Sequence, residues 1–155
     1  MFKKVLVLDS IRSMQNVWAI FRSADGAWFH AMYLCWFTPY PMRGEIEKTA
    51  LWAEKSIFWE YYQNAVEIVE KLKKEGFTIV CLEVSEKSVD FRTFAQTQTS
   101  PVCFILWNEV SWVSNELQSL SDQHVMIPMK WVKTSLNVSV AASVIMYEFL
   151  DFLNE

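Results

Sequence analysis

Short apolar runs recur along the chain, and they restrict its fold more than any other feature. Each run is too short to cross a membrane and too continuous for a strand with one exposed face. Each therefore predicts a β-strand, and the first, third and fourth of them predict buried strands. The runs cover Lys4 to Leu8, Phe29 to Cys35, Phe77 to Val84, Val102 to Leu106 and Val125 to Ile127.

Segments with helical periodicity lie between the runs. In the clearest one, from Asn64 to Glu75, apolar residues recur on one face, Glu and Lys form i,i+4 pairs, and Gly76 follows the end. Further helices are predicted over Asn16 to Asp25, around Asp90 to Phe94, and from Ser135 to Leu153. Strands that alternate with helices predict an α/β fold, a mostly parallel sheet with helices on both faces.

Length and composition favour one folded domain, residues 1–155, with 52% apolar and 21% charged residues. Asp9 interrupts the first apolar run too early for a signal peptide, and no run could span a bilayer, so we expect a cytoplasmic protein without membrane association. The net charge of −4 argues against a broad nucleic-acid surface, so any RNA site must be local.

Side chains of common catalytic and metal sites are scarce. No phosphate-binding glycine loop, nucleophile elbow or metal-ligand spacing occurs, and no metal is expected. The three cysteines lie in apolar runs, where they predict buried free thiols. His30 and His124 lie beside predicted strands, where structural roles are the more common ones.

Three segments stand out from this background. They read NVWAIFRSADG at 16–26, FILWNEVSWV at 104–113, and IPMKWVKTSLNVSVAA at 127–142. In content and order they closely resemble the three signature motifs of the SpoU-type SPOUT RNA methyltransferases. With the strands between them, the resemblance covers nearly the whole chain.

The resemblance implies both a fold and an activity. The fold would be an α/β knot, with a deep trefoil knot in the C-terminal part, assembled as a homodimer. The activity would be transfer of a methyl group from S-adenosylmethionine to a ribose 2'-hydroxyl of tRNA or rRNA. The product derived from the cofactor would be S-adenosylhomocysteine.

Arg22 occupies the position of the family's catalytic arginine. Because a guanidinium keeps its proton at neutral pH, we assign it orientation of the substrate and stabilisation of developing negative charge rather than the role of base. The more ordinary reading is an ion pair with an acidic neighbour. Asn16 either caps the predicted helix or positions the substrate through its amide, and one residue could do both.

Three further positions match polar residues of the family's catalytic site. Glu109 follows a buried strand, where the family places a carboxylate near the arginine, although a solvated carboxylate is the plainer reading. Ser135 and Asn137 open the last predicted helix. They can cap this helix, or offer a hydroxyl and an amide to the site.

Cofactor binding in the family uses backbone groups and apolar walls from three loops, which leaves little trace in side chains. Carried onto this sequence, the resemblance implies contacts from the following positions: Leu82, Glu83, Leu106, Trp107, Asn108, Glu109, Ile127, Met129, Ser135 and Leu136.

Tryptophan stands at several positions where the family pattern has glycine. These positions are Trp107, Trp112 and Trp131 in the motif loops, with Trp18, Trp28, Trp36 and Trp52 elsewhere. Glycine serves where backbone meets a ligand closely or takes a positive φ, and tryptophan suits neither purpose.

Three consequences of these tryptophans stay open. The loops could tolerate the indoles, and the protein would be an active methyltransferase. Alternatively, Trp107, Trp112 and Trp131 could fill the adenosine pocket and leave an inactive knotted scaffold of engineered origin. The replacements could also loosen or prevent folding.

Overall fold

A seven-stranded sheet organises the protein, as seen in a computed structural model that describes residues 2–41, 56–107, 113–130 and 135–150. The strand order is β3-β2-β1-β6-β4-β7-β5, and every recorded pair is parallel. The strands are β1 (Lys4–Asp9), β2 (Ala31–Cys35), β3 (Phe58–Tyr62), β4 (Thr78–Leu82), β5 (Val89–Asp90), β6 (Val102–Trp107) and β7 (Gln123–Met126).

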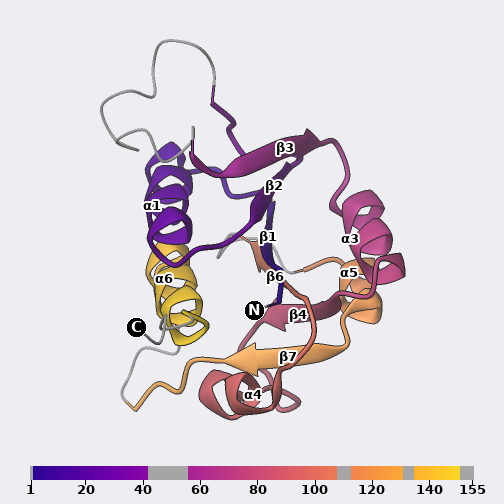
Figure 1. Ribbon diagram of the computed structural model, residues 1–155, viewed down its shortest axis with the longest axis vertical. Coiled ribbons are helices and arrows are strands. Elements are labelled where there is room, and N and C mark those ends of the chain that lie inside the picture. The colour runs from indigo at the N-terminus through magenta and orange to yellow at the C-terminus, as the bar shows by residue number, and fades with distance from the viewer. Residues whose placement is uncertain (1, 42–55, 108–112, 131–134, 151–155) are drawn as a thin grey trace.

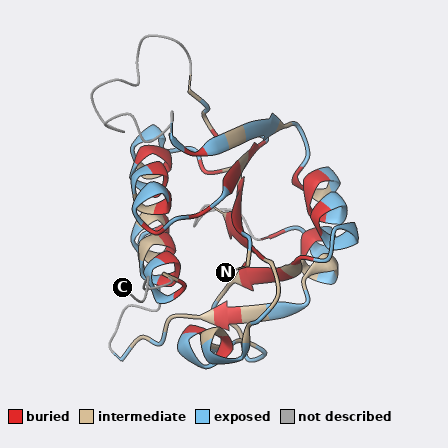
Figure 2. Cartoon of the chain, viewed as in Figure 1, coloured by how far each residue is buried: buried red, intermediate tan, exposed pale blue. Residues whose placement is uncertain are grey.

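Five described helices cover the two faces of this sheet (Figure 1). They are α1 (Met14–Gly26), α3 (Ala65–Lys74), α4 (Phe91–Thr97), α5 (Asn115–Leu120) and α6 (Val138–Glu148). One apolar cluster joins the sheet to α1, α4 and α6, and a second joins the opposite face to α3 and α5. The central strands β1 and β6 are buried on both sides (Figure 2), so the prediction of a parallel α/β fold is confirmed.

The predicted elements are present, but several of their boundaries differ from the expected ones. The helix expected at Asn16 to Asp25 begins at Met14, because the Ser13 hydroxyl accepts a hydrogen bond from the Asn16 amide and caps it. Asn16 is therefore not the N-cap. The last helix begins at Val138 rather than Ser135, since Asn137 is its cap.

Three elements were missed by the sequence patterns. β3 lies at an edge of the sheet and is largely exposed, so it lacks the apolar run that marks the central strands. β5 has only two residues, and α5 has six, of which Leu117 is the buried one. Elements this short bury too little surface to leave a clear periodicity.

Two helices end in the same hydrogen-bond pattern, which requires a left-handed residue. After α3 this residue is Gly76, with φ +87°, and Phe77 N–H donates to Leu72 C=O. After α1 it is Trp28, with φ 56°, and Phe29 N–H donates to Ala24 C=O. The prediction that Trp28 occupies a position suited to glycine is confirmed, because its φ is positive.

Two other tryptophans differ in their surroundings. Trp36, which follows β2, has φ 50°, so its backbone also lies in the region that glycine favours. Trp18 lies within α1 with its indole buried in the core, 5.5 Å from the Phe21 ring. Trp28 and Trp36 therefore have the backbone geometry that favours glycine, whereas Trp18 has helical backbone. Trp52, Trp112 and Trp131 lie outside the described residues.

Within the described ranges, no helix is long and apolar enough to cross a membrane.

Candidate active site

The carboxyl ends of three neighbouring strands form one edge where the expected cofactor contacts meet. Leu106 lies near the end of β6, Leu82 ends β4, and Ile127 follows β7. In the sheet, Cys81 is in register with Ile105, and Leu82 is in register with Val125. The side chains of Leu82, Leu106 and Ile127 therefore lie within about two strand spacings, or roughly 10 Å. All three pack with the apolar cluster on the α1 and α6 face.

Trp107 packs on the other face of the sheet. Its half-buried indole contacts the apolar cluster beneath α3 and α5, because neighbouring side chains of a strand point to opposite sides. The indole is thus separated from Leu82, Leu106 and Ile127 by the sheet. Trp107 therefore does not fill the space beside these three side chains. The inactive-scaffold alternative requires its indole to fill that space.

Glu83 is held firmly at this edge. Its backbone N–H donates to Val125 C=O at 2.9 Å, and the Ser88 hydroxyl donates to its C=O at 2.7 Å. The carboxylate lies 3.1 Å from Nδ1 of His124 on β7, and both side chains are largely buried. Sequence reasoning gave His124 only a general structural role, and nothing in the sequence pairs two residues that are 41 positions apart.

A hydrogen bond joins the first and third motifs. Asn137 Nδ2 donates to Asn16 Oδ1 at 3.3 Å, while Asn137 Oδ1 accepts from the Ser139 backbone N–H at 2.9 Å. The Asn137 side chain therefore caps α6 and bridges to α1 simultaneously. The two predicted site residues are brought together across 121 positions of sequence.

Further contacts continue along α1 and α6, which run side by side. The hydroxyls of Ser23 and Ser143 are 2.7 Å apart, and a β-carbon added at Gly26 would meet the Tyr147 hydroxyl at 2.6 Å. Because paired positions advance together along both helices, α1 and α6 are parallel and their N-termini lie at the same end.

Arg22 lies on the exposed surface of α1, in a shallow cleft of about 370 Å³ between α1 and α6. The cleft is lined by Gln15, Ala19, Arg22, Ser23 and Tyr147. Among the described residues the guanidinium makes no hydrogen bond or ion pair, so the ordinary ion-pair role is not observed there. Tyr147 was not singled out by its sequence context.

Three of the remaining predicted site residues lie in described loops, and two lie outside the described residues. Ser135 is exposed and Leu136 half-buried, and both precede α6 without belonging to it. Met129 is half-buried and follows Ile127. Asn108 and Glu109 lie outside the described residues, so their predicted roles stay predictions.

The cysteines lie in the interior of the protein. Cys35, Cys81 and Cys103 are buried and free, as predicted. Burial raises the pKa of the Cys81 thiol to about 11, despite a hydrogen bond with the Ser121 hydroxyl, and raises those of the other two thiols further. Within the described ranges no cluster of His, Cys, Asp and Glu could hold a metal ion.

Solved structures share this architecture. The A. aeolicus TrmH/SpoU tRNA modifying enzyme superposes with a TM-score of 0.83 at 30% identity, covering 97% of this chain and 75% of that one. The SpoU methyltransferase AviRb from Streptomyces viridochromogenes, in complex with the cofactor AdoMet, superposes with a TM-score of 0.82 at 25% identity, over 96% of this chain and 59% of that one.

Curated relatives are named as tRNA methyltransferases. The chain is 32% identical, over 93% of its length, to the tRNA (guanosine(18)-2'-O)-methyltransferase of Aquifex aeolicus, and 30% identical over 91% to that of Escherichia coli K12. It spans 67% and 60% of those two proteins. The sequence profile of the SpoU rRNA Methylase family matches residues 3–147, and the chain belongs to this family.

Proposed function

We propose that the protein is an S-adenosylmethionine-dependent RNA methyltransferase that modifies a ribose 2'-hydroxyl of tRNA or rRNA. The observation that carries the proposal is the contact between Asn16 and Asn137, because it joins two of the three family motifs at the N-termini of parallel helices. The named activities of the relatives support the same chemistry. The relatives come from bacteria, whose tRNA and rRNA are cytoplasmic, and the proposed location is therefore the cytoplasm.

The residues at the sheet edge suit the adenosine part of the cofactor. Leu82, Leu106 and Ile127 offer apolar walls on one side, and Glu83 is a fixed carboxylate able to accept a hydrogen bond from a hydroxyl or amino group. Ser135, Leu136 and Met129 would contribute from the segments before α6. The bound cofactor would supply an electrophilic methyl group on a positively charged sulfur.

The chain's own polar groups would orient the acceptor ribose. In the transfer, the 2'-oxygen bonds to the methyl carbon, the carbon–sulfur bond breaks, sulfur keeps the electron pair, and the hydroxyl proton leaves. Arg22 would hold the developing oxyanion or a neighbouring phosphate through the hydrogen-bond donors of its guanidinium. A substrate phosphate is the group proposed to take the proton. Asn16 and Asn137 would position the sugar through their amides, and Glu109 would complete the site.

A homodimer is part of the proposal. Val140, Val144 and Tyr147 lie three to four residues apart on α6 and are exposed, and Met14 of α1 is also exposed. Such a stripe is typical of a helix that packs against another surface. A second copy packed there would cover the Arg22 cleft, because Tyr147 lines it. The C-terminal trefoil knot rests on the family resemblance, and the assignment of residues 1–155 to one domain rests on the length and composition of the chain.

The test measures cofactor binding and methyl transfer separately. Calorimetric titration with S-adenosylhomocysteine should show binding by the chain and by a variant with glycine at positions 107, 112 and 131. Transfer of labelled methyl groups to a tRNA transcript should then occur with the parent and fall by roughly a hundredfold or more in Arg22→Ala. The S-adenosylhomocysteine affinity of this variant should stay unchanged.

Two results would overturn parts of this proposal. Binding by the glycine variant alone would favour the inactive scaffold, with Trp112 and Trp131 as the blocking residues, because Trp107 packs on the opposite face. Full methyl transfer by Arg22→Ala would remove Arg22 from the mechanism. Replacement of exposed Gln15, which lines the same cleft, by Ala is the matched control.

A further inference from the structure

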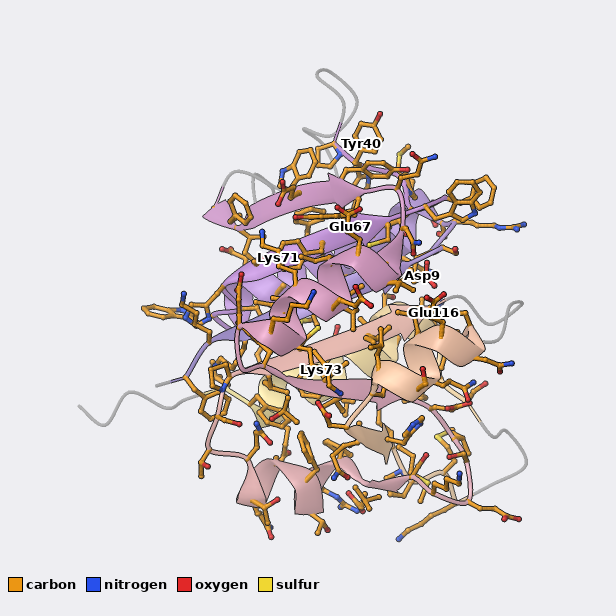
Figure 3. The ribbon with its side chains drawn as sticks, turned by 90° about the vertical axis from the view of Figure 1, so that its right-hand side faces the viewer. Asp9, Tyr40, Glu67, Lys71, Lys73 and Glu116 are labelled. Atoms are coloured by element: carbon orange, nitrogen blue, oxygen red, sulfur yellow. The ribbon has the colours of Figure 1, made fainter. Side chains whose placement is uncertain are left out.

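An aromatic surface lies at the β3 edge of the sheet and is not used by the proposed chemistry. Tyr40, Trp59 and Tyr61 form it, with ring centroids 6.4 Å apart for Tyr40 and Trp59 and 5.0 Å apart for Tyr40 and Tyr61. Figure 3 labels Tyr40 beside β3. Tyr40 is 44% and Tyr61 39% exposed, so aromatic rings face solvent there.

The surface faces the same side of the sheet as the candidate catalytic helix. Trp59 packs against the apolar cluster beneath α1 and α6, whereas Tyr62 packs against the opposite cluster. Since β-strand side chains alternate, Tyr61 shares the side of Trp59, and Phe58 and Glu60 share the side of Tyr62. The acidic Glu60 therefore does not face the aromatic surface.

A cationic group lies beside the segment that connects β2 to Tyr40. The Arg12 guanidinium lies 5.7 Å from the centre of the Phe37 ring, which is 58% exposed. The buried Thr38 hydroxyl accepts from Ile11 N–H at 3.0 Å and donates to Leu8 C=O at 2.9 Å, which fastens the segment after β2 to the β1–α1 connection. Arg12 directly precedes Ser13, the cap of α1, and Asn16 follows within one helical turn.

We propose that Tyr40, Trp59 and Tyr61 stack unpaired bases of the RNA substrate, while Arg12 contacts its backbone. Aromatic faces bind single-stranded nucleic acid by stacking and tolerate any base, and an arginine beside them complements the phosphate charge. A protein with net charge −4 gains from such a surface, because stacking does not require a broad basic patch. The substrate would be a loop or single strand rather than a duplex. This inference rests on the proposed RNA methyltransferase function.

The test compares short single-stranded oligoadenylate with an RNA duplex of equal length by fluorescence anisotropy. Tyr40→Leu with Tyr61→Leu should weaken binding of the single strand by about tenfold or more, since each stacked base is worth roughly five- to a hundredfold in affinity. Duplex binding should change little. Phe58→Leu is the matched control, because Phe58 is 58% exposed on the same strand but on the other side.

Further variants keep the outcome interpretable. Tyr61→Phe retains the ring but loses the hydrogen bond from its hydroxyl to Trp36 C=O, so it should bind oligoadenylate like the parent. The inference would be overturned if the double variant and Phe58→Leu bound oligoadenylate with equal affinity. It would also be overturned if the double variant lost as much affinity for the duplex as for the single strand. If S-adenosylhomocysteine binding and methyl transfer persist in that case, the proposed function stands and only the stacking surface fails. Absence of any RNA binding by the parent would overturn both.

A second inference comes from the tryptophans in left-handed backbone. Trp28 and Trp36 lie in a region that residues with a β-carbon rarely adopt, and Gly76 fills the equivalent position after α3. The chain has eight tryptophans and three glycines, and the family resemblance implies glycine at seven of the tryptophan positions. We infer that cells making this protein insert glycine there, through the one codon, UGA, that different genetic codes read as tryptophan or as glycine.

Peptide mass spectrometry of the protein purified from its own cells tests this inference. Glycine at positions 28 and 36, with tryptophan retained at Trp59, is the expected result. Tryptophan at positions 28 and 36 would overturn it. Because Tyr40, Trp59 and Tyr61 are unaffected, the stacking surface does not depend on this result.

Discussion

Replacing Trp28 by glycine should stabilise the protein. Trp28 holds φ 56° at the end of α1, and its own N–H donates to Asp25 C=O at 3.2 Å. Left-handed backbone costs a residue with a β-carbon roughly 1–2 kcal/mol. Glycine relieves this cost but loses roughly 0.5–1 kcal/mol through the greater freedom of the unfolded chain. The indole is 59% exposed, so its removal sacrifices little packing.

The net gain should be about 1 kcal/mol, or a rise in Tm of about 2–4 °C for a chain of this size. Urea unfolding of Trp28→Gly and of the parent measures this difference in unfolding free energy, which follows from the midpoint and slope of each transition. The reciprocal control is Gly76→Ala, because a β-carbon at Gly76 meets nothing within 4 Å and the cost is conformational alone. This variant should lose about 1 kcal/mol. A Trp28→Gly midpoint at or below that of the parent would refute the reasoning.

Other predictions concern caps, a buried carboxyl and the thiols. The variants Asn137→Ala and Asn64→Ala each remove a helix cap, and each should lower the free energy of unfolding by about 1 kcal/mol. Only Asn137→Ala should also lower methyl transfer. Equal methyl-transfer activities of the two variants would remove Asn137 from the site. Burial raises the pKa of Asp9, so its contribution to stability is present at low pH and lost as pH rises through that pKa. Asp9→Asn should therefore be more stable than the parent at neutral pH, by a margin that shrinks on acidification; a constant margin in urea titrations would contradict this. The three buried thiols should react with a chromogenic disulfide only after unfolding, and rapid labelling of the folded chain would show that they are accessible.

Apolar runs located the central strands because those strands are buried on both faces, where most positions are apolar; the buried Lys4 of β1 is an exception. β3 escaped detection for the opposite reason, since an edge strand with exposed aromatic rings has no such pattern. Helix caps were partly predictable. Asn64 was expected at the start of its helix and caps α3, but Ser13 rather than Asn16 caps α1, because several polar residues compete near the start of that helix.

Motif order identified the family from the sequence by itself, and with it the residues proposed for the site. Tertiary structure alone decided which of them meet. Asn16 contacts Asn137, Glu83 contacts His124, and Trp107 turns away from Leu106. Local sequence sets backbone preferences and strand periodicity, whereas contacts over 41 or 121 positions depend on strand order and on the face that each side chain occupies. Those are properties of the assembled sheet.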